Sequence, residues 1–174
     1  MNRVRLVVID GYNMLWGSSR YRAHMDRDIE SAREKLINDV AQWRRDDDDV
    51  YLVFDAGASP ESTGEVQHVL GISVIYSPYG EEADATVESI VSGRRDQGFD
   101  IVVVTSDSQT QWVTLGRRVT RISAEQFGKE VAITQADVMG DQHQQHMASR
   151  IEDRIEPRVK DLLEQIFGRN KKTG

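Results

Sequence analysis

Three apolar runs in this sequence stop at, or one or two residues before, an aspartate. VRLVVI is followed by Asp10, VYLVF by Asp55 and IVVVTS by Asp107, while a fourth acid, Asp84, lies within GEEADA. Carboxylate oxygens, without histidine or cysteine, are ligands that Mg²⁺ and Mn²⁺ prefer. One or two such ions activate water and stabilise the leaving oxygen when a phosphodiester is hydrolysed. The pattern therefore predicts metal-dependent hydrolysis of phosphodiester bonds.

Each acid also has an ordinary explanation when it is taken alone. Asp10 suits a turn, Asp84 would stabilise the first turn of a helix through its dipole, and Asp107 would cap a helix. Carboxylates gathered at one place are harder to explain, because two of them about 4 Å apart repel by roughly 4 kcal/mol at a dielectric constant near 20. A cluster of four needs a cation, so the set favours metal binding.

Short apolar runs alternate with helical stripes, and these elements must position the acids. Continuous valine and isoleucine runs are typical of strands buried on both faces of a parallel sheet. Strands are expected at Val4–Ile9, Val50–Phe54, Ile72–Tyr76, Ile101–Thr105 and Val119–Ile122. Helices are expected at Ile29–Arg45 and Ala83–Gln97, and Ser123 opens a third through a capping box with Gln126.

This alternation predicts an α/β fold, a three-layer α/β/α sandwich around a central, mostly parallel sheet, with extra C-terminal helices. The carboxyl ends of parallel strands lie along one edge, where open α/β sheets bind their ligands. Asp10, Asp55 and Asp107 are expected to meet at that edge, and Asp84 to face it from the start of the following helix.

Residues 1–150 are expected to form one domain. A last helix starting near Pro157 and ending at Gly168 accounts for residues 151–168, and the basic tail, 169–174, is expected to be disordered. The 174 residues include no cysteine, and no apolar run approaches the roughly 20 residues of a membrane span. A cytoplasmic location is therefore expected.

The net charge of −7 argues against a protein that coats polyanions without specificity, because such proteins are usually basic. It allows a nucleic-acid enzyme whose acids gather at a metal site while basic residues cluster elsewhere. The acidic run Asp46–Asp49 is expected to be a solvated loop, and His143 and His146 to lie on the surface. The arginines expected to contact RNA phosphates are Arg20, Arg22, Arg117, Arg118 and Arg121.

Four segments together resemble the YacP-like branch of the NYN-domain family, which is related to the PIN-domain nucleases. They are VVIDGYNM (7–14), LVFDA (52–56), EEADA (81–85) and TSDSQTQW (105–112), and they stand in the family's order and approximate spacing. The resemblance covers about residues 4–130, with a weaker echo in 155–168. It implies a PIN-like fold and metal-dependent cleavage of RNA.

The resemblance also implies roles for individual residues. Asn13 would orient a ligand or water beside the metal, and Ser106 would support Asp107 through its hydroxyl. The implied metal ligands are Asp10, Asp55, Asp84 and Asp107, with Glu81 as a possible fifth. Members of this branch are described as ribosome-associated endoribonucleases, so mRNA on a ribosome is the implied substrate. One departure is that residues 132–150 are less basic than the family's usual helix.

Two alternatives remain open. A phosphatase that forms an aspartyl-phosphate usually has a second aspartate two residues after the first, and this chain has Tyr12 there, which counts against it. The other alternative is a non-catalytic RNA- or ribosome-binding module that retains the PIN-like fold. The complete set of acids argues against such degeneration.

Overall fold

The structure is a computed structural model that describes residues 4–57, 61–106 and 118–152, with side chains described as far as residue 141. The described residues form one six-stranded sheet in the order β3-β4-β2-β1-β5-β6. Its strands are β1 (Arg5–Asp10), β2 (Asp48–Phe54), β3 (Val66–Val69), β4 (Ile72–Tyr76), β5 (Asp100–Val104) and β6 (Val119–Ile122). Neighbouring strands are parallel except for the antiparallel pair β3 and β4. The predicted α/β fold with a mostly parallel sheet is confirmed.

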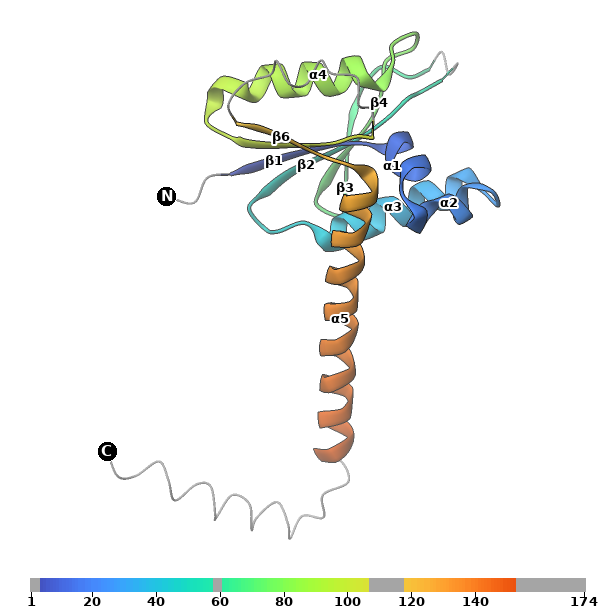
Figure 1. The fold of residues 1–174 in the computed structure, drawn as a ribbon, viewed down its shortest axis with the longest axis vertical. Coiled ribbons are helices and arrows are strands. Elements are labelled where there is room, and N and C mark those ends of the chain that lie inside the picture. Colours follow the sequence, from blue (N-terminus) through green and yellow to red (C-terminus); the bar gives the residue numbers. More distant parts are fainter. Residues whose placement is uncertain (1–3, 58–60, 107–117, 153–174) are drawn as a thin grey trace, which may run out of the picture. The chain divides into compact units, whose positions relative to one another are not determined.

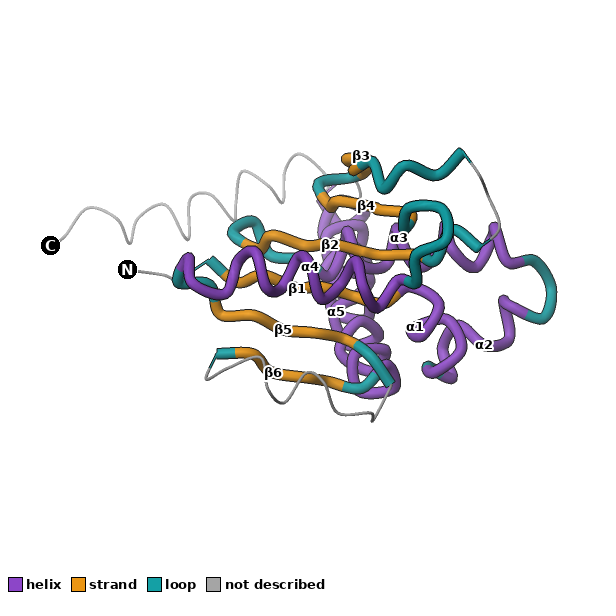
Figure 2. Tube along the Cα trace, turned by 90° about the horizontal axis from the view of Figure 1, so that it is seen from above, coloured by secondary structure: helices purple, strands orange, loops and turns teal. Residues whose placement is uncertain are grey.

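Helices cover both faces of the sheet. The helix α4 (Ala83–Arg94), which continues into a short 3-10 helix at Arg95–Gln97, lies across β1 and β2 on one face (Figure 2). The other face carries α1 (Gly11–Gly17), α2 (Ser19–Met25), α3 (Ile29–Trp43) and the first residues of α5 (Ala124–Glu152) (Figure 1). These layers form the predicted α/β/α sandwich.

The side chains of β1 alternate between two hydrophobic cores, because successive residues of a strand point to opposite faces. Leu6 and Val8 pack in one core with Val87 of α4. Val7 and Ile9 belong to the core on the other face, which includes α3 and the start of α5. All four strand residues are fully buried, and each such side chain contributes about 1.5–3 kcal/mol of hydrophobic stabilisation. The continuous apolar run that precedes Asp10 is explained by this double burial.

Three short elements go beyond the expected set. The strand β3 forms a hairpin with β4 through the two residues Leu70 and Gly71. The helices α1 and α2 occupy the segment between Asp10 and Ile29, where the sequence pattern predicts no element. The capping box at the start of α5 is confirmed on one side, because the backbone N–H of Gln126 donates to the Ser123 hydroxyl at 3.2 Å.

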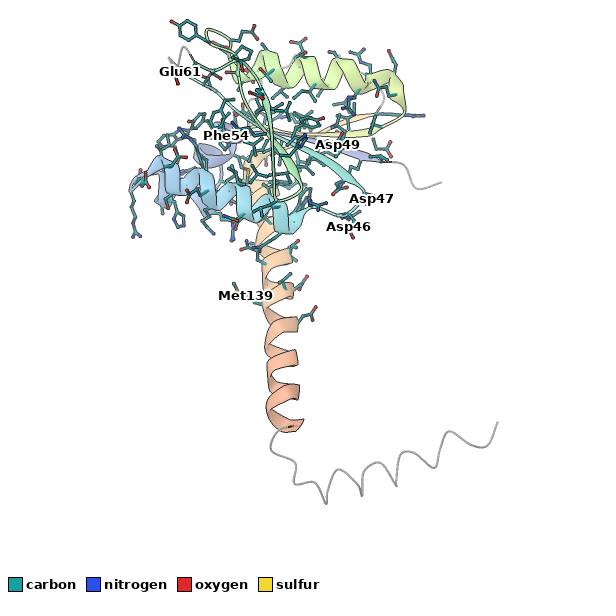
Figure 3. All side chains as sticks on the ribbon, turned by 180° about the vertical axis from the view of Figure 1, so that it is seen from behind. Asp46, Asp47, Asp49, Phe54, Glu61 and Met139 are labelled. Carbon is teal, nitrogen blue, oxygen red and sulfur yellow. The ribbon has the colours of Figure 1, made fainter. Side chains whose placement is uncertain are left out.

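The acidic run from Asp46 to Asp49 is only partly the expected solvated loop. Its last two residues begin β2 and form ion pairs, Asp48 with Arg5 at 2.5 Å and Asp49 with Arg94 at 3.1 Å. Figure 3 labels Asp46, Asp47 and Asp49 at the entry to this strand. Half of the run therefore ties β2 to β1 and α4.

The chain divides into two compact units, residues 1–135 and 136–174. The sheet, the first four helices and the first residues of α5 belong to the first unit. The predicted last helix and the tail lie outside the described residues, so the boundaries at 150 and 168 stay predictions. Among the described residues, no helix has both the length and the apolar character needed to cross a membrane.

Candidate functional site

Asp10 lies where β1 passes directly into α1. Its Oδ1 accepts a hydrogen bond from the backbone N–H of Asn13 at 3.0 Å, so it caps the amino end of α1. Gly11 lies against Phe54, and a Cβ at this position would come within 2.4 Å of the phenyl ring. These two residues explain why an aspartate and a glycine follow the strand. The helix cap also holds the Asp10 carboxylate, on a residue only 9% exposed, at the carboxyl end of β1.

Asn13 joins the end of β1 to the end of β5. Its Oδ1 accepts a hydrogen bond from the backbone N–H of Ser106 at 2.5 Å. Gly17 allows the close approach, because a Cβ there would lie 2.5 Å from the Ser106 hydroxyl oxygen. Both predicted supporting residues therefore lie at this edge. The predicted contact of the Ser106 hydroxyl with Asp107 stays a prediction, because Asp107 lies outside the described residues.

Asp55 and Asp84 reach the same edge from two other elements. Asp55 follows β2, is half-buried, and accepts a hydrogen bond from the backbone N–H of Gly57 at 2.6 Å. Asp84 lies in the first turn of α4, where the helix dipole favours a negative charge. Each carboxylate is thus positioned by its own local structure. The sheet order β2-β1-β5 then brings the ends of these strands together.

These residues line one open pocket of about 520 Å³, which we call the acid pocket. Its lining residues are Asp10, Tyr12, Asn13, Trp16, Gly17, Asp55, Glu82, Ala83, Asp84 and Ser106. Glu82, the N-cap residue of α4, is among them, whereas Glu81, the possible fifth ligand, is not. Asp107 is one of the residues outside the described ranges. The structure therefore brings three of the predicted acids together with Asn13 and Ser106.

The donor chemistry of the acid pocket fits a hard divalent cation. Its predicted donors are carboxylate, amide and hydroxyl oxygens, the groups that Mg²⁺ and Mn²⁺ prefer. Within the part of the chain that the structure describes, no three histidine, aspartate or glutamate side chains form a group that could hold a metal ion. Asp107, the fourth predicted ligand, lies outside these described residues and is not counted among them.

A second pocket of about 740 Å³ adjoins the first and shares Tyr12 and Asp55 with it. We call it the tyrosine pocket, and its lining residues are Tyr12, Arg33, Asp55, Ala56, Gly57, Glu61, Ser62, Thr63, Glu65, Gln67 and Tyr76. Figure 3 labels Glu61, which belongs to this lining, and Phe54, on which the two tyrosines pack. The two pockets together follow the carboxyl edge of the sheet.

Phe54 supports the aromatic wall of the tyrosine pocket. It is fully buried, meets Tyr12 edge-on with ring centroids 5.4 Å apart, and stacks on Tyr76 at 5.5 Å. Arg33 lies over both tyrosine rings, 5.5 Å from one centroid and 6.0 Å from the other. Two nitrogens of Arg33 donate to the Tyr12 hydroxyl oxygen, Nε at 2.9 Å and Nη2 at 2.5 Å. Burial raises the pKa of Tyr76, although the charge of Arg33 opposes the shift, so this phenol stays neutral near pH 7.

The predicted RNA-binding arginines of α2 make contacts inside the first unit. Arg20 donates to the buried carboxylate of Asp39 at 3.0 Å and to the side-chain oxygen of Gln135. Arg22 donates to the backbone carbonyl of Trp16 at 3.1 Å, which places it beside a residue of the acid pocket. Arg20 therefore has a structural role in the described residues, and RNA contact by either side chain stays a prediction.

Two of the predicted arginines near β6, Arg118 and Arg121, lie at opposite ends of that strand. The Nε of Arg121 donates to the carbonyl of Thr105 at 3.4 Å, beside the end of β5 and hence near the acid pocket. Arg118 lies at the start of the strand, where its carbonyl accepts from the backbone N–H of Ile101, at the other edge of the sheet. Arg117 lies outside the described residues. Of the two arginines that the structure describes here, Arg121 is the one placed beside the acids.

Sequence reasoning did not select Trp16, Glu82 or the Arg33–Tyr76 pair as site residues. Glu82 adjoins Glu81 in the sequence. The sequence therefore indicates the correct acidic segment, but the wrong glutamate of the pair as the residue that lines the pocket. Trp16, which is 55% exposed, lies one helical turn beyond Tyr12 on α1, and that periodicity was an available signal. Arg33 and Tyr76 meet only through the tertiary fold, and no local pattern marks them.

The model of the YacP-like NYN domain family matches residues 7–168 of this chain. The chain belongs to that family. NYN domains are PIN-like nuclease domains, so the strand-end acids of the acid pocket lie in a chain of nuclease ancestry. The resemblance inferred from four short segments is confirmed.

One curated relative and two solved structures are similar to this chain. The uncharacterized protein YacP of Bacillus subtilis (strain 168) is 28% identical over 131 residues, which cover 72% of this chain and 74% of that protein. The crystal structure of Rae1 (YacP) from Bacillus subtilis matches with a TM-score of 0.66 and 24% identity, covering 100% of this chain and 99% of that one. A crystal structure of a point mutant of Rae1 matches with a TM-score of 0.62 and 24% identity over 87% of this chain and 85% of that one. The fold is therefore shared with these proteins.

Proposed function

We propose that this protein is an endoribonuclease that hydrolyses RNA phosphodiesters with Mg²⁺ or Mn²⁺ as its cofactor. One observation carries the proposal: Asp10 ends β1, Asp55 directly follows β2 and Asp84 lies in α4, and all three line a single pocket at the carboxyl edge of the mostly parallel sheet. Membership of a PIN-like nuclease family supports the same chemistry. The substrate, the metal and the residue roles below are parts of this proposal.

Asp10, Asp55, Asp84 and Asp107 would hold the metal, with Glu81 or Glu82 near enough in sequence to contribute. When bound, the ion supplies a water of lowered pKa and offsets charge on the leaving oxygen. Asn13 positions the nearest ligand, because its backbone N–H holds the Asp10 carboxylate while its side chain is held by Ser106.

Single-stranded RNA suits the surroundings of the acid pocket. Trp16 is exposed and lines the pocket, and exposed aromatic rings stack on unpaired bases. Arg121, positioned at the same edge by the carbonyl of Thr105, would contact a phosphate of the backbone. The family resemblance makes mRNA on a ribosome the candidate physiological substrate, which would place the protein in the cytoplasm.

The test is cleavage of an end-labelled mRNA with Mg²⁺ or Mn²⁺, with and without translating ribosomes, and again with a chelator. We expect discrete cuts that need the metal, and a gain on ribosomes if translation presents the substrate. Cuts that persist in the chelator would overturn the metal-dependent mechanism. RNA binding without any cut would instead support the non-catalytic binding module.

A further inference from the structure

Apart from Asp55, which it shares with the acid pocket together with Tyr12, the tyrosine pocket has no role in the hydrolysis proposed above. We propose that it is a nucleobase site, selective for guanine, for a nucleotide next to the phosphodiester that is cut. This inference rests on the proposed function for its substrate class, and on the pocket's own chemistry for the choice of base.

The position of the pocket fits a nucleobase of an RNA strand, and its size is large enough to admit one. Its volume of about 740 Å³ lies within the roughly 300–1,000 Å³ that small-molecule sites enclose. Because Tyr12 and Asp55 line both pockets, a strand with a phosphate in the acid pocket passes directly into the tyrosine pocket. The neighbouring nucleotide is therefore the natural occupant.

Charge decides between a base and a phosphate as the bound group. Among the described residues, the carboxylates of Glu61 and Glu65 line the pocket beside Asp55, which is proposed to hold the metal, and the single cation in the lining is Arg33. That cation is already paired with Glu30 of the same helix at 2.5 Å. A phosphate would meet net negative charge, whereas a neutral base carrying N–H donors would find acceptors.

The aromatic wall supplies the stacking surface. Unpaired bases bind proteins by stacking on aromatic rings or on the plane of an arginine guanidinium. Arg33 lies over Tyr12 and Tyr76, and Phe54 packs behind both rings. This support fixes the planar groups before a ligand arrives, so little side-chain entropy is lost when the base binds.

Guanine matches the polar groups better than the other bases. Its Watson–Crick edge presents adjacent N–H donors that one carboxylate accepts in pairs, and its O6 and N7 accept from arginine. Adenine, cytosine and uracil each set a lone pair beside the donor on that edge, which a carboxylate repels. Glu61 or Glu65 is the expected acceptor, and Arg33 the expected donor.

Binding of the four nucleosides to metal-free protein tests the base site without cleavage. In calorimetry, we expect wild type to bind guanosine about tenfold more tightly than adenosine, cytidine or uridine, the discrimination typical of one paired contact. The Glu61→Gln/Glu65→Gln variant is expected to lose that preference. The matched control is Glu34→Gln/Glu88→Gln, which changes two exposed glutamates outside both pockets. Equal affinity of wild type for all four nucleosides would overturn the inference.

Mapping of cleavage sites separates failure of the base site from failure of the nuclease. With the base site intact, guanine is expected at one fixed position beside the wild-type cuts, and the Glu61→Gln/Glu65→Gln variant is expected to lose it. Cuts without base preference, by a protein that does not discriminate among nucleosides, would overturn the base site alone. Selective guanosine binding by a protein that never cuts RNA would overturn the nuclease and retain the base site.

Discussion

At the scale of single residues, local structure and the proposed chemistry use the same side chains. Asp10 caps α1 and lines the acid pocket, and Asp84 lies at a helix start while facing the same pocket. Asn13 extends this arrangement, since its backbone holds Asp10 and its side chain holds the end of β5. A helix cap is thus a way to fix a carboxylate at the edge of the sheet, and does not argue against a metal ligand.

Gly11→Ala tests how tightly the wall behind the site is packed. The new Cβ would lie 2.4 Å from the Phe54 ring, which is buried and cannot move freely. We expect a loss of about 1–3 kcal/mol in the free energy of unfolding, as for other overpacked cores. Urea unfolding would measure it, with Gly93→Ala as the control.

Gly93 lies in α4, and a Cβ added there would have no neighbouring atom within 4 Å. Alanine at this position is expected to raise the free energy of unfolding by roughly 0.5–1 kcal/mol, because it favours the helix and meets nothing. If the two alanine variants had equal stability, the close contact between Gly11 and Phe54 would be wrong.

At the scale of elements, one buried carboxylate ties three helices of the first unit together. Asp39 of α3 is 4% exposed and accepts hydrogen bonds from Arg20 and from the Tyr21 hydroxyl, each at 3.0 Å, both on α2. Gln135 of α5 donates to the same carboxylate, and Lys35 lies 3.3 Å from it. The pKa of Tyr21 is raised mainly by burial and further by the negative charge of the Asp39 carboxylate.

Asp39→Asn is expected to destabilise the protein by about 3 kcal/mol. The amide would direct an N–H group toward donors and leave Arg20 without its buried anion. Chemical unfolding at pH 7 measures this loss, and Glu34→Gln on the exposed face of the same helix is expected to change it by less than about 0.5 kcal/mol. A loss of similar size in both variants would contradict the network.

The ion pair between β1 and β2 predicts a dependence of stability on pH. Burial alone would raise the pKa of Asp48, but hydrogen bonds from Arg5 and the Arg45 backbone lower it below its ordinary value. Because the pKa of Asp48 is lower in the folded state than in the unfolded state, its ionised carboxylate stabilises the fold. This contribution to the free energy of unfolding is complete above about pH 4, the ordinary aspartate range, and is lost as the pH falls through the folded pKa.

Asp48→Asn is therefore expected to cost about 1 kcal/mol of stability at pH 7 and progressively less below pH 4. Asp46→Asn, in the exposed turn of the same acidic run, is the control and is expected to have little effect at any pH. Urea unfolding at pH 7, 5 and 3 makes the comparison. An unchanged difference between wild type and Asp48→Asn at pH 3 would contradict the assigned titration.

At the scale of the whole molecule, metal binding and folding are linked. An ion bound only by the folded state adds about 2.7 kcal/mol of stability at a concentration one hundred times its Kd. For a chain of 174 residues this is an increase of about 5–10 °C in Tm. We expect Mn²⁺ to produce this shift in wild type and a smaller one in Asp55→Asn. An equal shift in both would place the metal elsewhere, for example on the acidic run 46–49.

The sequence predicted the parts of the molecule that local chemistry determines. Continuous apolar runs marked the strands buried on both faces, and their terminal aspartates marked the edge that carries the acid pocket. The strand β3 was missed because most of its residues are exposed and because its turn uses Leu70 at a φ of 51°, which a non-glycine residue rarely adopts. The tyrosine pocket was missed because Arg33 and Tyr76, 43 positions apart, meet only in the folded chain.

The most direct test of the central claim compares RNA cleavage by wild type, Asp84→Asn and Asp96→Asn at saturating Mn²⁺. Asp84 lines the acid pocket, whereas Asp96 is exposed in the 3-10 helix that follows α4, outside both pockets. We expect Asp84→Asn to lose at least about a hundredfold in rate, equivalent to about 2.7 kcal/mol of transition-state stabilisation, and Asp96→Asn to cut like wild type. Undiminished cleavage by Asp84→Asn would contradict the assignment of the acid pocket as the catalytic site.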